Sequence, residues 1–192
     1  MWSLLFIEAC KLASTTTIWS FSIPILSVHS EVPVHLDFIV TMILAIGFLC
    51  GQVLATYYAN GKVHQHIAIT CVAAIISCVL LWVFLKDYRW ALVGVFFISS
   101  MPLINIFIQV RLLQIVPDNR YLIFCLNNSA LFAGNFIGSL SAYLIMKTTA
   151  TNHWIVILAM GFATLALLAW LYLNRHTQRQ QPADAAFGSK TI

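Results

Sequence analysis

Charged residues are scarce in this sequence. Asp, Glu, Lys and Arg together make up only 8% of the 192 residues, whereas 61% are hydrophobic. A soluble globular domain carries about 25% charged residues, so this composition cannot cover a surface that faces water. The formal net charge of +4 is spread thinly and forms no basic patch, so we expect no nucleic-acid partner. The shortage of charge therefore excludes a soluble domain and indicates a membrane protein.

Motifs for catalysis or metal binding are missing as well. The sequence has no nucleophile–base motif and no phosphate-binding glycine loop, so we expect neither an enzyme nor a cofactor, and a membrane enzyme is the last alternative. His64 and His66 flank Gln65 without a third ligand nearby. We interpret them as an exposed pair in a loop rather than as a metal site. The five cysteines lie in apolar segments without metal-ligand spacing and are interpreted as packing residues: Cys10, Cys50, Cys71, Cys78 and Cys125.

Long apolar runs are the dominant feature that is present. About 20 apolar residues are enough for a helix to cross the hydrocarbon core of a bilayer. The sequence predicts an all-α, polytopic membrane protein with six transmembrane helices, which we number as spans one to six: 2–28, 38–58, 66–85, 90–110, 122–146 and 153–173. Residues 1–174 form the expected six-helix bundle, and the polar residues 175–192 form a cytoplasmic tail that we expect to be disordered. Because the first ten residues lack a basic segment, we expect span one to be retained rather than cleaved as a signal peptide.

The basic residues of the loops predict an orientation. Lys and Arg concentrate in cytoplasmic loops. One face of the predicted bundle carries six of them (Lys62, Arg111, Arg120, Arg175, Arg179 and Lys190), and the other face carries three (Lys86, Arg89 and Lys147). This difference predicts that both termini lie in the cytoplasm.

Span one contains the candidate coupling residues, Glu8 and Lys11. They are one helical turn apart, so they can meet on one helix face and lower the free energy of placing charge near hydrocarbon. One interpretation is a carboxylate that couples protons or substrate, with a basic partner. The other is that both side chains reach the membrane interface from near the helix end. Six hydroxyl residues follow between Ser14 and Ser22, and they either line a polar cavity or bond back to the helix backbone and bend it.

Span four carries a polar stripe around a proline. Ser99, Pro102, Asn105 and Gln109 are spaced by three, three and four residues, so they share one helix face. A polar stripe with a proline is typical of a helix that lines a transporter cavity. Hydrogen bonding between helices of the bundle is the alternative interpretation.

Span five has a continuous face of small residues. Ala130, Gly134, Gly138 and Ala142 recur every four residues, which predicts a helix-packing surface that another helix can approach closely. Asn127, Asn128 and Asn135 lie on or beside this face. They are candidates either for joining helices or for contacting a ligand.

Four short motifs in residues 105–146 resemble a known family. Gln109-Val-Arg111, Val116-Pro117, Leu126-Asn-Asn-Ser129-Ala130 and Gly134-Asn135-x-x-Gly138 are similar to the tenth and eleventh helices of major facilitator superfamily exporters. The likeness is strongest to the drug and arabinose efflux group of proton-coupled antiporters. Two features depart from the family. The segment from Gly51 to Lys62 lacks the acidic residue and most basic residues of the family's gating loop, and Phe132 stands where asparagine is common.

The resemblance implies a fold and a function. Members have two six-helix halves with the substrate site between them at the midplane of the membrane, and this chain resembles the C-terminal half. Spans one and four would then line the cavity, spans two and five would pack against the other half, and spans three and six would face lipid. The implied function is proton-coupled export of small molecules, drugs or sugars, from a bacterial inner membrane. Glu8 and Lys11 would serve coupling, and Asn105, Gln109 and Asn135 would contact the substrate.

Two alternatives remain open on the sequence. The chain is either a truncated or decayed transporter that transports nothing, or a small membrane protein that associates with itself across the Gly134/Gly138 face. The expected partners are the lipid bilayer, protons and a small-molecule substrate, together with the missing N-terminal half or a second copy.

Overall fold

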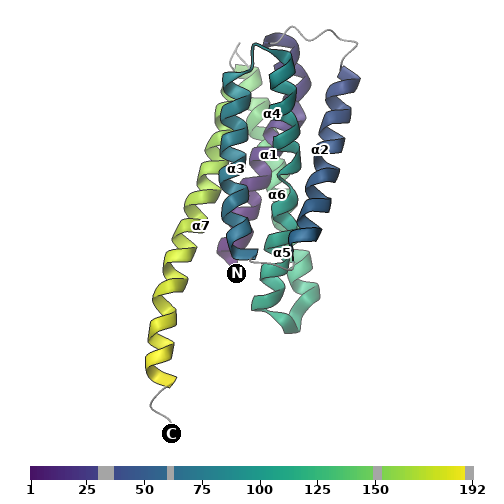
Figure 1. The fold of residues 1–192 in the computed structure, drawn as a ribbon. Coiled ribbons are helices and arrows are strands. Elements are labelled where there is room, and N and C mark those ends of the chain that lie inside the picture. The colour runs from purple at the N-terminus through teal and green to yellow at the C-terminus, as the bar shows by residue number, and fades with distance from the viewer. Residues whose placement is uncertain (30–36, 60–62, 149–152, 189–192) are drawn as a thin grey trace.

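The computed structural model describes residues 1–29, 37–59, 63–148 and 153–188. Within these ranges the chain is all-α, as predicted, and forms a bundle of long helices (Figure 1). The elements in chain order are α1 (Trp2–His29), α2 (Asp37–Tyr58), α3 (Val63–Val83), α4 (Tyr88–Ser100), α5 (Leu103–Ile115), the short 3-10 helix η2 (Pro117–Asn119), α6 (Arg120–Thr148) and α7 (His153–Gly188).

Five segments of the described chain are long and apolar enough to cross a membrane. They are Asp37–Tyr58, Val63–Val83, Tyr88–Ile115, Arg120–Thr148 and His153–Arg175. The chain therefore has the character of a multi-pass membrane protein. The remaining long helix, α1, contains Glu8, Lys11 and a run of hydroxyl residues, and these polar side chains set it apart from the other five segments.

Helix α1 lies at the centre of the bundle. It packs most extensively against α6 and α7, and it also contacts α4 and α5. Most of its side chains beyond the first turns are buried, and they include six polar residues: Glu8, Lys11, Ser14, Thr15, Thr17 and Ser22. Polar residues of α1 therefore face neighbouring helices rather than lipid, and this arrangement lets a partly polar helix lie inside an apolar bundle.

The small-residue face of α6 is covered by α1. A Cβ added at Gly134 would lie 3.0 Å from the Ala9 Cα, and one added at Gly138 would lie 2.9 Å from the Ala13 Cα. The sequence correctly predicted a packing surface here, but the expectation that its partner lies outside the chain is wrong, because α1 fills it. In this structure the Gly134/Gly138 face is therefore occupied by α1 rather than exposed to a second copy of the chain.

Helix α2 approaches α4 in the same manner. A Cβ at Gly47 would lie 2.7 Å from the Phe96 carbonyl oxygen, and one at Gly51 would lie 2.9 Å from the Ser100 Cα. Small residues let helix backbones approach closely and gain van der Waals contact. The bundle thus contains two closely packed helix pairs, α1–α6 and α2–α4.

The predicted span four is two helices rather than one. Helix α4 ends at Ser100 and α5 begins at Leu103, with Pro102 at the N-cap of α5. Proline has no backbone N–H and its ring clashes with the preceding turn, so the helix breaks here. At its other end α4 is capped by Asp87, whose Oδ1 accepts a hydrogen bond from the Arg89 backbone N–H at 3.1 Å.

Helix α3 begins earlier than predicted, and this corrects the interpretation of two histidines. His64 and His66 lie in the first turn of α3, not in a loop. A hydrogen bond of 2.8 Å joins His64 Nε2 to Asn174 Oδ1, and the His64 ring lies 5.0 Å from the Trp170 ring. The His66 ring stacks on Phe107 at 5.2 Å. These histidines are packing residues of the bundle rather than an exposed pair.

Helix α7 continues past its apolar segment into the polar residues that the composition predicts to be disordered. Its backbone is helical to Gly188, and its last turns project beyond the bundle (Figure 1). Ala, Gln and Arg are frequent in this stretch and favour a helix. The first turn of α1 and the last turns of α7 lie at the same end of the bundle (Figure 1).

Candidate functional site

Glu8 and Lys11 are buried inside the bundle but do not bond to each other. Each side chain is only 1% exposed. Both carboxylate oxygens of Glu8 and the Nζ of Lys11 have no hydrogen-bond partner among the described residues. The burial favours the coupling interpretation over the interfacial one, because neither side chain reaches the surface of the bundle. Their functional roles remain predictions.

The two side chains have different neighbours. Glu8 is within electrostatic range of Asn127 on α6, although no hydrogen bond of normal geometry forms. Lys11 is within electrostatic range of the Cys71 and Cys78 thiols on α3. Ionisable groups without partners inside a membrane protein are unfavourable for stability and are usually functional. The two residues are therefore separate candidates rather than an ion pair.

A cleft of about 430 Å³ lies along α1, where its lining begins at Leu12; neither Glu8 nor Lys11 lines it. Four helices line it, and none of the ten lining residues is charged. They are Leu12, Thr15, Thr16 and Trp19 of α1, Phe48 and Gln52 of α2, Pro102 and Asn105 of α5, and Leu131 and Asn135 of α6. Amide and hydroxyl groups beside two aromatic rings can bind a small molecule by hydrogen bonding and stacking. The cleft is therefore the candidate substrate site.

Hydrogen bonds between helices hold the polar lining in place. The Thr16 hydroxyl donates to Asn135 Oδ1, and the Trp19 Nε1–H donates to Ser99 Oγ at 3.1 Å. These bonds join α1 to α6 and to α4. They also position Thr16, Trp19 and Asn135 at the cleft wall.

Asn127 links the cleft to the region of Glu8. Its Nδ2 donates a hydrogen bond of 2.9 Å to Asn105 Oδ1, and Asn105 lines the cleft. The Asn127 side chain is completely buried, and its Oδ1 has no hydrogen-bond partner. Asn105, Asn127 and Glu8 thus form a row of polar side chains that runs from the cleft into the interior of the bundle.

The hydroxyl residues of α1 satisfy both interpretations offered by the sequence. Thr15 and Thr17 donate to carbonyl oxygens one turn earlier in α1, those of Lys11 and Ala13. Ser14 instead donates to the Ala159 carbonyl of α7 at 2.7 Å. Some hydroxyls therefore bond within α1, others join helices, and Thr15 and Thr16 also face the cleft.

The structure brings together part of the predicted site. Asn105 and Asn135 line the cleft, whereas Gln109 is half-buried one turn further along α5 and does not. Gln52, Trp19 and Phe48 line the cleft but were not singled out from the sequence. Gln52 offered a signal, because it is the one amide in the apolar run of α2. Across the residues that the structure describes, no three His, Cys, Asp or Glu side chains gather to hold a metal ion.

Comparison of the chain with protein-family models, with curated proteins and with solved structures gave no match. The five long apolar segments of the described chain support one class of protein, a helical, multi-pass membrane protein. The resemblance to the major facilitator superfamily stays an expectation.

Proposed function

We propose that this chain is the C-terminal half of a proton-coupled major facilitator exporter of small molecules, either drugs or sugars. The cleft of about 430 Å³ is the observation that carries the proposal. Its surface is mostly apolar, and its polar lining residues come from α1, α2, α5 and α6. The resemblance implies that spans one and four line the cavity. Polar groups gathered between helices of an apolar bundle are typical of a transport pathway.

In this proposal α1 is the sixth membrane-spanning helix. Its 28 residues extend for roughly 42 Å, which exceeds the hydrocarbon thickness of about 30 Å. Six crossings agree with the two chain ends lying at the same end of the bundle (Figure 1). The excess of Lys and Arg in the loops at that end supports cytoplasmic termini in a bacterial inner membrane.

Glu8 is the proposed proton carrier, and Lys11 is a second, separate buried group that we assign to coupling. A carboxylate that alternates between the charged and neutral forms needs a site away from bulk water with a polar route to the substrate. The buried Glu8 and the hydrogen-bonded Asn127 and Asn105 supply that arrangement. Asn105 and Asn135 would contact the substrate directly, because both line the cleft.

A second six-helix unit would complete the cavity. Helices α2 and α6 flank the cleft and expose large apolar side chains, which include Leu49 and Val53 on α2 and Phe132 and Phe136 on α6. The missing N-terminal half or a second copy of the chain would cover this face. A decayed transporter would have the same fold, so an assay must separate it from the proposal.

The proposal is tested with everted membrane vesicles from the source cells, which contain the chain together with whatever unit completes it. An acridine dye reports the pH gradient, and ethidium and arabinose serve as probe substrates. At least one probe is expected to release protons in wild-type vesicles. Glu8→Gln should abolish this release, because the amide cannot carry a proton. Asp118→Asn is the matched control, because Asp118 is exposed in η2.

Three outcomes separate the alternatives. Proton release that is lost only in Glu8→Gln supports the proposal. Equal release in both variants would remove Glu8 from the coupling mechanism. The absence of release with every probe, although the chain is inserted in the membrane, would favour the decayed fragment over a transporter.

A further inference from the structure

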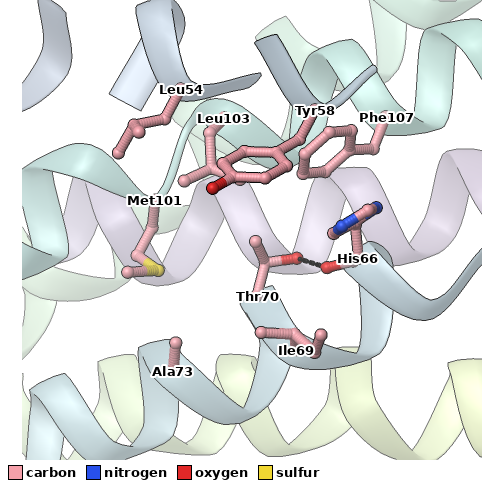
Figure 2. A pocket seen from close by; sticks show the side chains of 9 residues that line it. All are labelled: Leu54, Tyr58, His66, Ile69, Thr70, Ala73, Met101, Leu103 and Phe107. Carbon is pink, nitrogen blue, oxygen red and sulfur yellow. Dashed lines mark hydrogen bonds between the residues drawn. The ribbon is translucent and has the colours of Figure 1, made fainter. Parts of the chain in front are cut away.

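A second hollow in the bundle shares no lining residue with the cleft. It has a volume of about 250 Å³. Figure 2 shows the nine side chains that line it: Leu54 and Tyr58 of α2, His66, Ile69, Thr70 and Ala73 of α3, and Met101, Leu103 and Phe107 at α5. We call it the α2–α3 groove.

The groove opens towards the lipid-facing surface of the bundle. Helices α2 and α3 hardly contact each other, whereas both pack against α5. The side chains at the mouth are apolar and exposed, with Leu54 at 49% and Ile69 at 61% exposure. Whatever fills the groove in a membrane therefore enters from the bilayer.

The polarity of the lining changes along the groove. Tyr58 is the last residue of α2 and His66 is the fourth of α3, so both lie near one end of the bundle. Ala73, seven residues beyond His66, lies about 10 Å deeper along α3. Met101 and Leu54 also line the apolar part. The outer end of the groove therefore carries an aromatic ring and an imidazole at interfacial depth, and the inner end is apolar. This arrangement matches a molecule that has a polar head and a hydrocarbon tail.

The surface of the groove is almost entirely apolar, and the polar groups lie at its outer end. The Thr70 hydroxyl is already used, because it donates to the His66 carbonyl oxygen at 2.8 Å (Figure 2). It also donates to the Ile67 carbonyl oxygen at 2.9 Å. The His66 ring packs against the rings of Tyr58 and Phe107. Within the described chain it makes no hydrogen bond, and its Nδ1 is buried. Its Nε2 is therefore the nitrogen that can meet a ligand.

A positively charged residue lies one helical turn beyond the lining residue Phe107 on α5. Arg111 follows Phe107 by four residues on α5, so both residues are on one helix face. Its Nη1 donates to Gln114 at 3.2 Å, which leaves other guanidinium donors free. Arginine binds phosphate groups well because several N–H donors point in one plane.

We propose that the α2–α3 groove binds one acyl chain of a membrane phospholipid, with the phosphate of the headgroup beside His66 and Arg111. The groove is about 10 Å deep, which is about two thirds of the ~15 Å half-width of the hydrocarbon core, so it can hold most of an acyl chain while the ester region stays at the interface. The lipid fills an apolar hollow that water would not occupy favourably. This site is independent of the cleft and of the transport function.

Native mass spectrometry of the detergent-purified chain tests the proposal. Wild-type protein is expected to retain one phospholipid, with phosphatidylglycerol preferred over phosphatidylcholine. Ala73→Phe fills the groove, so the retained fraction should fall about tenfold. Val72→Phe is the matched control, because Val72 is the adjacent residue of α3 and is exposed outside the groove. If Ala73→Phe does not fold, Leu54→Trp blocks the groove from α2 instead.

Photo-crosslinking of the same detergent-purified protein locates the retained lipid. A benzophenone amino acid replaces Ile69 at the mouth of the groove or Ile76 two turns further along α3. An adduct of phospholipid mass at position 69 and not at position 76 supports the proposal. Three results would overturn it. They are the absence of retained lipid, equal retention in wild type and Ala73→Phe, and a crosslink from position 69 to a second copy of the chain.

Discussion

Gly138 of α6 lies directly against Ala13 of α1, so closely that a Cβ on Gly138 would come within 2.9 Å of the Ala13 Cα. One turn earlier, Gly134 lies against Ala9 in the same way. The neighbouring atoms belong to the α1 backbone, which cannot rotate away as a flexible side chain can. The interface between α1 and α6 therefore depends on the absence of side chains at two positions.

Gly138→Ala is expected to lower the free energy of unfolding by about 1–3 kcal/mol, because the added methyl group forces the two helices apart. Gly161→Ala in α7 is the matched control, since no atom lies within 4 Å of a Cβ there. That control should leave stability unchanged or raise it by up to about 1 kcal/mol. Equilibrium unfolding in mixed micelles measures both variants. Equal stability for both would contradict the close α1–α6 contact.

Lys11→Met is expected to raise the free energy of unfolding by about 1–3 kcal/mol, because a buried amine without a hydrogen-bond partner is replaced by an apolar side chain of similar length. Lys11 is 1% exposed and its Nζ is unpartnered. Lys147→Met, at an exposed position near the end of α6, should have little effect. A clear loss of stability in Lys11→Met would show that the lysine stabilises the fold through a partner.

The hydrogen bond from Asn127 to Asn105 predicts coupling between the two residues. In a double-mutant cycle with both changed to Ala, the coupling energy should be about 0.6–1.7 kcal/mol, the range found for side-chain hydrogen bonds inside membrane proteins. Asn105→Ala combined with Asn119→Ala is the control, because Asn119 is exposed in η2. That pair should be additive within about 0.5 kcal/mol. Additivity in the first pair as well would show that the bond contributes nothing.

Asn135→Cys should react with a charged methanethiosulfonate reagent about tenfold faster or more than Ile76→Cys, because only a thiolate in contact with water is reactive. Asn135 lines the cleft, whereas Ile76 on α3 is 54% exposed on the outside of the bundle. The exposed thiols Cys50 and Cys125 are first changed to Ser. Similar slow labelling at both positions in membranes would show that the cleft excludes water.

The sequence predicted the apolar helices well, because a run of about 20 apolar residues specifies a membrane-crossing helix by itself. It placed helix ends less well. The start of α3 was missed because His64 and His66 are polar and resemble a loop until their partners Asn174 and Phe107 are known. The break at Pro102 was visible as a residue, but whether a proline bends or divides a helix depends on its surroundings.

Prediction of the site was limited by the arrangement of the helices. Spacing placed Asn105 and Gln109 on one helix face, but only packing shows that Asn105 lines the cleft and Gln109 does not. The small residues around Gly134 predicted a close contact without naming α1 as the partner. Periodicity within a helix identifies a face, whereas the identity of the facing helix depends on contacts between residues far apart in the chain.

The two closely packed helix pairs divide the bundle into two blocks. One contains α1 and α6, the other contains α2 and α4, and backbone contact within each pair leaves little room for internal rearrangement. The cleft lies between the blocks, because its lining includes α1 and α6 of one block and α2 of the other, and the hydrogen bond from Trp19 to Ser99 joins α1 to α4 across that boundary. Widening the cleft therefore requires one block to move relative to the other, and such a movement would have to break the hydrogen bond between Trp19 and Ser99.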